Sequence, residues 1–179
     1  NDTVNRVQYD FWKTQQELFN ERFLTPFNEW CHNEGTDSRS EAYGCYEIDP
    51  IENKLIADRP MGETWIAMVS DIPTSEVLIP VDKQISATNM GIWSCRANKY
   101  TSSAAHLAGR AEVSCETMTS GSSAFRLRPQ DIKVALDMDF VSGINQTYYH
   151  GYNWSPPQAG FPGWFYCGSY IDDKELWWP

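Results

Sequence analysis

The stretch Ile132-Lys-Val-Ala-Leu-Asp-Met-Asp-Phe140 is the most regular element in this sequence. Its large apolar side chains recur at every second position, and Lys133, Asp137 and Asp139 occupy the alternate positions. Alternation with a period of two over this length is typical of an antiparallel strand that has one buried face and one solvated face. The stretch therefore predicts an antiparallel sheet.

Shorter apolar runs predict the partner strands of this sheet. Turn residues separate them, as expected for strands joined by loops. The predicted strands cover residues 64–69, 76–81, 93–97, 111–117, 125–128 and 164–170.

The N-terminal segment, residues 3–34, predicts an amphipathic helix. Thr25-Pro26 predicts a break with Thr25 capping a second short helix, because proline disfavours a helical residue before it and suits a first turn. Gly35 predicts the end of the helix. Apolar residues at three- and four-residue steps form the stripe expected to pack on the sheet: Val4, Val7, Phe11, Phe19, Phe23, Phe27 and Trp30.

These elements together predict an α+β fold, in which a long N-terminal amphipathic helix packs on an antiparallel, sandwich-like sheet. We expect a single domain over residues 1–179, because this length supplies one stable core. Within it, residues 1–34 are helical, 35–62 are mostly loop, 63–147 hold the antiparallel strands, and 148–179 form aromatic loops, a strand and a tail.

Charge and hydropathy exclude several classes of partner. The formal net charge of -10 argues against nucleic acid, whose binding needs clustered Lys and Arg. No run of apolar residues is long enough for a transmembrane segment. No leader precedes Asn1, so we expect any signal peptide to have been removed.

The five cysteines predict disulfides and an oxidising compartment. Their spacing matches no zinc motif. We expect Cys31 to pair with Cys45 and Cys95 with Cys115, each bridge stabilising the fold by about 3 kcal/mol, and Cys167 to be left over. The predicted location is therefore secreted or extracytoplasmic. The alternative is a set of buried free thiols in a cytosolic protein.

Aromatic residues concentrate at the C-terminal end. Residues 148–178 hold 11 of the 25 aromatic side chains, interleaved with glycine and proline. Flat rings on a rigid loop bind sugars, lipid headgroups or apolar partners at little cost in side-chain entropy. The alternative is that these rings cover the core. The expected ligand contacts are the rings of Tyr148, Tyr149, Tyr152, Trp154 and Trp164 and the hydrogen-bonding groups of His150 and Asn153.

Catalytic motifs are scarce. The sequence has neither a Gly-x-Ser-x-Gly elbow nor a phosphate-binding glycine loop. On a strand, Asp137 and Asp139 would share one face about 7 Å apart, a spacing that suits a glycosidase pair or two calcium ligands. The alternative is a solvated strand face. We expect no other cofactor.

Two resemblances suggest alternatives without assigning a family. Gly62-Glu-Thr-Trp-Ile-Ala and Thr74-Ser-Glu-Val-Leu-Ile-Pro resemble the opening strands of actinoporin-type pore formers, which implies a membrane-active toxin. A long helix before a cysteine-bearing sheet is similar to a pilin head, which implies a structural subunit with protein assembly partners.

The favoured hypothesis is an extracytoplasmic, non-enzymatic binding module for a glycan or another cell-surface ligand. This hypothesis rests on the aromatic segment and on the lack of a catalytic motif. The structural subunit, the toxin and a small hydrolase using Asp137 and Asp139 are the alternatives.

Overall fold

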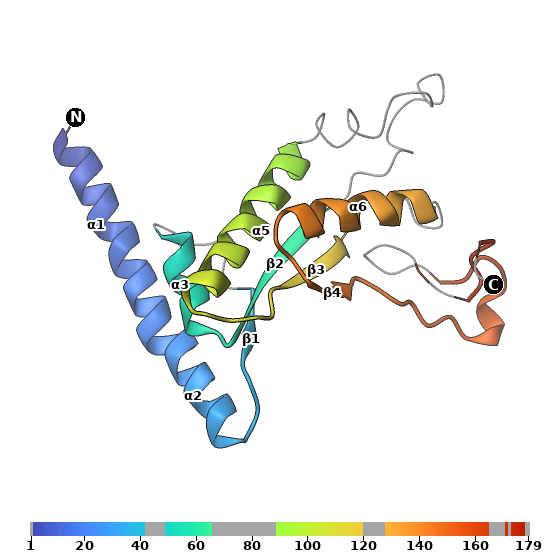
Figure 1. The fold of residues 1–179 in the computed structure, drawn as a ribbon, viewed down its shortest axis with the longest axis horizontal. Helices are drawn as coiled ribbons and strands as arrows, with labels where there is room; N and C mark the ends of the chain where they lie inside the picture. Colours follow the sequence, from blue (N-terminus) through green and yellow to red (C-terminus); the bar gives the residue numbers. More distant parts are fainter. Residues whose placement is uncertain are drawn as a thin grey trace.

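The structure is a computed structural model that describes residues 2–41, 49–65, 89–119, 128–164, 171 and 173–177, without the side chains of 89–93. Its centre is a sheet of four parallel strands in the order β1-β2-β3-β4 (Figure 1). The strands are β1 (Arg39–Ser40), β2 (Arg59–Trp65), β3 (Ser114–Thr119) and β4 (Gln146–Tyr149). The predicted antiparallel, sandwich-like sheet is therefore wrong.

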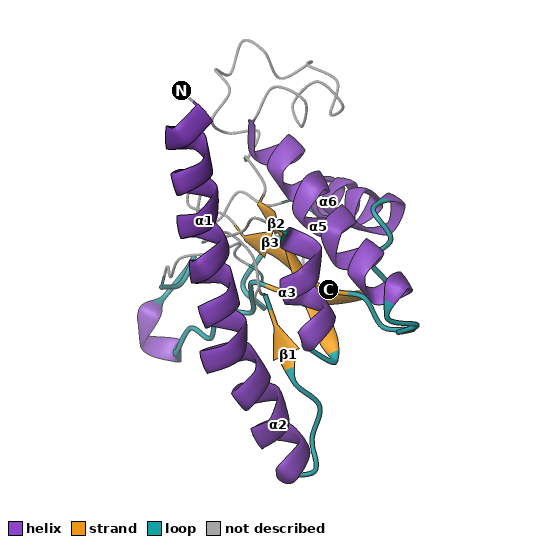
Figure 2. Ribbon diagram, turned by 90° about the vertical axis from the view of Figure 1, so that its left-hand side faces the viewer, coloured by secondary structure: helices purple, strands orange, loops and turns teal. Residues whose placement is uncertain are grey.

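Helices lie between successive strands because parallel neighbours need a crossover connection. These are α3 (Pro50–Ile56), α5 (Asn89–Leu107) and α6 (Pro129–Val141). The strand order follows the chain order, so right-handed crossovers place these helices on one face of the sheet. α5 packs mainly on β2, and α6 on β3 (Figure 2).

The stretch 132–140 lies in α6 and is helical. Pro129 stands in the first turn, and the Asp131 carboxylate accepts a hydrogen bond from the Arg128 backbone N–H at 3.0 Å, which closes the N-terminus. The buried positions, Ala135 and Asp139, are four residues apart, whereas Phe140 is exposed. The burial follows the helical period, so the alternation of apolar residues misled the strand prediction.

Several other predicted elements also differ from those in the structure. The predicted strand at 93–97 lies in helix α5, and the run at 111–117 overlaps β3, whose neighbours are parallel. The predicted loop at 35–62 contains β1 and α3, and the side chain of Asp49 caps α3 by accepting from the Ile51 and Glu52 backbone N–H groups. The run at 64–69 overlaps β2, whereas 76–81 and nearly all of 125–128 and 164–170 lie outside the described residues.

The N-terminal helix is confirmed as α1 (Asp2–Phe19), the π-helical turn η1 (Asn20–Leu24) and α2 (Thr25–Asn33). It ends before Gly35, whose φ is 73°. At Pro26 the chain stays helical, and Thr25 is no cap. The π-helical turn directly before this proline is a known way for a helix to absorb a local irregularity.

This helix buries a face beside the predicted stripe, with Gln16, Asn20, Leu24 and Cys31 as its buried side chains. Gln16 donates from Nε2 to the Asp49 carbonyl at 3.2 Å and to Glu52 Oε2 at 2.7 Å, and it accepts from the Asp49 N–H at 2.8 Å. A polar side chain can be buried here because its amide is satisfied. The predicted packing of the stripe on the sheet is wrong, since the exposed side chains include Val4, Val7, Phe11, Phe23 and Trp30.

The predicted disulfides are also wrong. Cys31, Cys95 and Cys115 are free thiols, whereas Cys45 and Cys167 lie outside the described residues. Burial raises the pKa of the Cys115 thiol to about 12, so this cysteine is uncharged at neutral pH. The extracytoplasmic location stays a prediction. Within the described helices, none is both long and apolar enough to cross a bilayer.

Candidate active site

The two faces of the sheet have different partners. Thr64 on β2 and Thr117 on β3 hydrogen-bond to Asp139 of α6, so they point toward the helices. Side chains alternate along a strand, so Glu63 and Glu116 project from the opposite face. These two glutamates are register partners on neighbouring strands.

Side chains from the two edges of the sheet meet over the face of Glu63 and Glu116. Arg39 belongs to β1 and Tyr148 to β4, at opposite edges of the sheet, and the Arg39 guanidinium carbon lies 3.9 Å from the centre of the Tyr148 ring. These two long side chains therefore bridge the strands between them on this face. Such cation–π contacts also hold both side chains in place.

Three glutamates meet on this face. Glu41 directly follows β1, and its carboxyl group shares a hydrogen bond with that of Glu116. Glu63 is close enough to add to the electrostatic field at Glu41. The cluster lies toward the carboxyl ends of parallel strands, which is where open sheets and barrels of this class hold their ligands.

The environment keeps a proton on the Glu41–Glu116 pair. Desolvation, the hydrogen bond that protonated Glu41 donates to Glu116 and the negative charges of Glu116 and Glu63 raise the pKa of Glu41 to about 8. The positive charge of Lys54, which is fully buried on α3, acts against this increase. At neutral pH Glu41 is therefore a carboxylic acid that can donate a proton.

Glu116 is held from two further sides. Its Oε1 accepts a hydrogen bond from Thr119 Oγ1 at 3.1 Å and lies 2.9 Å from Nδ1 of His150. The His150 contact has the distance of an ion pair but not the direction of a hydrogen bond, so Nδ1 has no hydrogen-bond partner among the described residues. The backbone N–H of His150 donates to the Thr117 carbonyl at 2.8 Å, which places the imidazole beside β3.

Basic side chains border the cluster at the start of the strands. Arg59 pairs with Asp37 at 3.0 Å and with Glu112 at 2.8 Å. These two carboxylates, together with a hydrogen bond to Tyr148, raise the pKa of Arg59. Arg59 is thus neutralised locally by carboxylates outside the cluster. The negative charge of the cluster is left to act on Glu41.

Behind the sheet, a buried network fixes β2 and β3 to the helices. Asp139 accepts hydrogen bonds from Asn98 Nδ2 at 3.0 Å, Thr117 Oγ1 at 2.7 Å and Thr64 Oγ1. Gly62 lets α5 approach closely, because a Cβ there would lie 2.1 Å from Oδ1 of Asn98. The strands that carry Glu63 and Glu116 therefore rest on a rigid layer.

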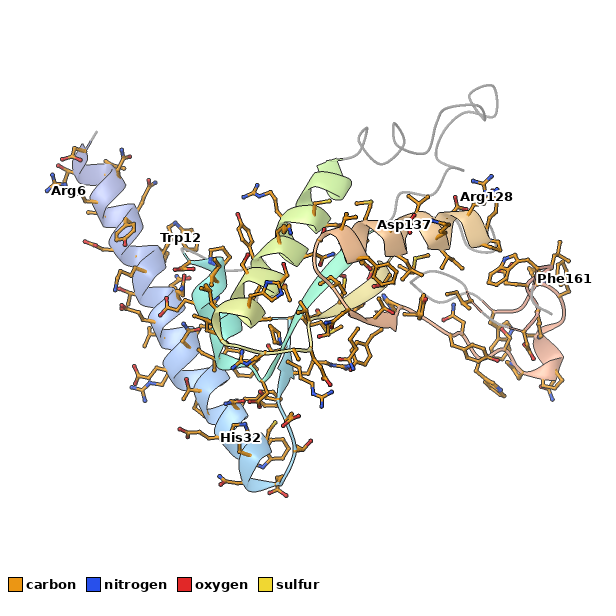
Figure 3. The ribbon with its side chains drawn as sticks, in the orientation of Figure 1. Arg6, Trp12, His32, Arg128, Asp137 and Phe161 are labelled. Carbon is orange, nitrogen blue, oxygen red and sulfur yellow. The ribbon has the colours of Figure 1, made fainter. Side chains whose placement is uncertain are left out.

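The predicted pair Asp137 and Asp139 is not brought together. Residues two apart on a helix point to different sides. Asp137 is exposed and pairs with Lys133, whereas Asp139 is fully buried (Figure 3). No group of three carboxylate, histidine or cysteine side chains suited to a metal ion occurs in the part of the chain that the structure describes.

The predicted aromatic contacts divide into two groups. Tyr148 lies half-buried on the face of the glutamate cluster, and His150 touches that cluster. Asn153 is half-buried, and its Nδ2 has no acceptor within the described segments. The others are exposed on or after β4: Tyr149, Tyr152, Trp154 and Trp164.

The glutamate cluster was missed by sequence reasoning. Glu116 falls in the predicted strand 111–117 and Glu41 in the predicted loop 35–62, and neither of them was assigned a role from the sequence. A carboxylate near the end of several short strands, each followed by a helix, is the pattern that would have indicated the site. This pattern can be read from the sequence only after the crossover helices have been recognised.

Comparison with solved structures supports the fold of this chain. A solved structure, a rhamnosidase from Novosphingobium sp. PP1Y, matches 79% of this chain with a TM-score of 0.60 and 23% sequence identity, which supports the fold. The chain spans 12% of that protein. No match is found among curated proteins.

The family comparison covers the whole chain. The model of glycoside hydrolase family 106, described as alpha-L-rhamnosidase, matches residues 1–179. The chain therefore belongs to glycoside hydrolase family 106.

Proposed function

We propose that this chain contributes catalytic carboxylates to an enzyme that hydrolyses α-L-rhamnosides. The observation that carries the proposal is the cluster of Glu41, Glu63 and Glu116 on one face of the sheet, in which burial and the neighbouring carboxylates raise the pKa of Glu41 to about 8. Glycoside hydrolysis needs one carboxylic acid to protonate the leaving oxygen and one carboxylate on the other side of the sugar. A protein with both forms at neutral pH has the required acid–base chemistry.

Family membership overturns the predicted non-enzymatic binding module and its alternatives, the pilin-like subunit and the membrane-active toxin. The predicted carbohydrate ligand is supported at the level of its class. Protein assembly partners have no support.

The three glutamates take different roles in this proposal. Glu41 donates its proton to the glycosidic oxygen as the bond to the anomeric carbon breaks. Glu116 is already engaged by Thr119, His150 and Glu41, so it positions Glu41 and keeps it protonated. Glu63 is then the carboxylate that activates water or attacks the anomeric carbon.

The leaving group tests the role of Glu41. Alkyl rhamnosides need protonation of a basic leaving oxygen, whereas 4-nitrophenol leaves readily as its anion. We expect Glu41→Gln to lower kcat/KM for methyl α-L-rhamnoside by about 10²- to 10⁴-fold and to affect 4-nitrophenyl α-L-rhamnoside far less. Glu63→Gln should lower both to a similar extent.

Glu29→Gln, an exposed change on α2, is the matched control and should keep wild-type rates. Calorimetry with L-rhamnose shows whether each variant still binds the sugar. If Glu41→Gln lowers kcat/KM equally for both substrates, Glu41 is not the proton donor. Full activity in Glu41→Gln and Glu63→Gln would place the reaction elsewhere.

A further inference from the structure

The segment that leaves β4 carries exposed aromatic rings away from the glutamate cluster. Tyr152 is 60% exposed, Trp154 72%, Phe161 70% and Trp164 61%. Figure 3 places Phe161 in the C-terminal segment beyond the carboxyl ends of the strands. Exposed aromatic area of this extent indicates a binding surface.

The exposure is not a result of a loose backbone. Lys174 Nζ donates to the carbonyls of Pro156 at 3.3 Å and Gly160 at 3.2 Å. The Trp164 N–H donates to Ser155 Oγ at 3.0 Å, and the Asn153 N–H to the Ile171 carbonyl at 3.2 Å. The backbone that carries the rings is therefore tied at several points, which lowers the entropic cost of binding a ligand.

The segment is continuous with the candidate active site. His150 contacts Glu116 at 2.9 Å, and Trp154 follows four residues later, so their Cα atoms are at most about 14 Å apart. A ligand whose end lies at the glutamates can therefore extend over Tyr152 and Trp154.

The chemistry of the segment identifies the ligand class. Residues 140–171 contain no Asp, Glu, Lys or Arg, in a chain of net charge -10. Such a surface favours a neutral ligand. Rings interleaved with Asn153, Ser155 and Gln158 offer apolar faces beside hydrogen-bonding groups, which match the two kinds of surface of a sugar ring.

We propose that Tyr152, Trp154 and Trp164 bind the leaving-group side of the substrate, by stacking on one or more neutral sugar rings attached to the rhamnose. This proposal rests on the proposed function, because it takes the terminal rhamnose to lie at the glutamates. It turns the aromatic segment into the element that selects among rhamnosides.

The test compares substrates that differ only beyond the glycosidic oxygen. We expect Trp154→Ala and Trp164→Ala to lower kcat/KM for a neutral trisaccharide with a terminal α-L-rhamnosyl unit by about tenfold, the loss of one favourable ring contact. Methyl α-L-rhamnoside, which has no second ring, should react at the wild-type rate. Trp30→Ala, at a tryptophan with 58% exposure on α2, is the matched control and should change neither rate.

4-Nitrophenyl α-L-rhamnoside separates a sugar from an aromatic leaving group. Loss on this substrate alone, with the trisaccharide unaffected, would overturn the sugar assignment in favour of an aromatic aglycone. A lowered Tm with equal losses on all substrates would overturn it in favour of rings buried against another part of the protein.

Calorimetry separates this proposal from the proposed function. The Kd of the trisaccharide should rise about tenfold in Trp154→Ala, while the Kd of L-rhamnose stays unchanged. An unchanged trisaccharide Kd in both tryptophan variants would overturn the aromatic subsite, even if the glutamate variants lose activity. Full activity in the glutamate variants would overturn the catalytic assignment, and the trisaccharide Kd would still test the rings.

Discussion

The carboxyl groups of Glu41 and Glu116 share a hydrogen bond, although the strands that position them, β1 and β3, are separated in the sheet by β2. The two side chains meet over β2, on the face where Arg39 also reaches Tyr148. Two carboxyl groups at this separation cannot both be ionised without a large electrostatic cost, so one of them retains its proton. The approach of Glu41 to Glu116 therefore determines the acid–base state of the site.

Replacing Glu116 by Gln tests this relationship directly. The change removes the nearest negative charge, so the pKa of Glu41 should fall from about 8 toward the ordinary glutamate value. The pH at which Glu41 ionises can be followed by NMR of carboxyl carbons in labelled protein. A matched variant, Glu29→Gln, removes an exposed carboxylate on α2 away from the cluster and should leave the pKa of Glu41 unchanged. An unaltered titration in Glu116→Gln would mean that burial alone maintains the proton.

Stability should depend on pH through the same group. The folded state raises the pKa of Glu41 from 4.5 to about 8, so it holds a proton that the unfolded state releases between these values. The free energy of unfolding contributed by Glu41 is thus fully present below pH 4.5 and is lost as the pH rises through 8.

Glu41→Gln cannot ionise and should remove this decline. Urea unfolding from pH 4 to pH 9 measures it: the variant should gain stability relative to wild type as the pH increases. A constant difference between the two proteins across this range would contradict the raised pKa.

The fold could be predicted from the sequence only in part. The N-terminal helix was found because its period of three and four residues continues over many turns, but its buried face was assigned wrongly. Apolar side chains were expected inside, whereas the buried face is anchored by the amide of Gln16. A hydrogen-bonding partner more than thirty residues away in the chain is not visible in a local pattern.

The prediction of an antiparallel sheet was wrong for a related reason. Both α6 and a half-buried strand can place apolar residues at alternate positions, and the deciding features were Pro129 and the capping side chain of Asp131. Once α6 was assigned as a strand, Asp139 was expected on its polar face beside Asp137. Composition alone marks the aromatic segment, whereas the glutamate cluster depends on strands that meet only in three dimensions.

Asp137 and Asp139 differ in burial and should differ in effect. Asp139→Ala leaves the groups of Thr64, Asn98 and Thr117 without their common acceptor, and we expect it to lower the free energy of unfolding by about 3 kcal/mol. Asp139→Asn keeps one acceptor oxygen and should cost about 1 kcal/mol. Asp137→Ala removes only an exposed pair with Lys133 and should change stability by less than about 0.5 kcal/mol. Urea denaturation measures all three, and equal losses at both positions would contradict the buried network.

Asp58 should control the order of the segment that leads into β1. Its carboxylate accepts hydrogen bonds from the Ser38 N–H at 2.9 Å and from Ser38 Oγ at 3.0 Å, and it lies 2.7 Å from His32 Nε2. Although desolvation opposes it, these hydrogen bonds lower the pKa of Asp58 below its ordinary value. The stability that Asp58 contributes is therefore present above pH 3.8 and is lost as the pH falls through its lowered pKa.

Asp58→Ala should accordingly speed hydrogen exchange of the Ser38 amide at neutral pH by about tenfold, since one hydrogen bond to a charged group contributes roughly 1.5 kcal/mol. The amide of Ala108, directly after α5, donates to the Ala104 carbonyl at 3.0 Å and should keep its exchange rate. Because Ser38 directly precedes Arg39 and Glu41, the same variant should also lower the activity assigned to Glu41. Unchanged exchange at Ser38 would show that β1 is held by its pairing with β2 and that the Asp58 brace is dispensable.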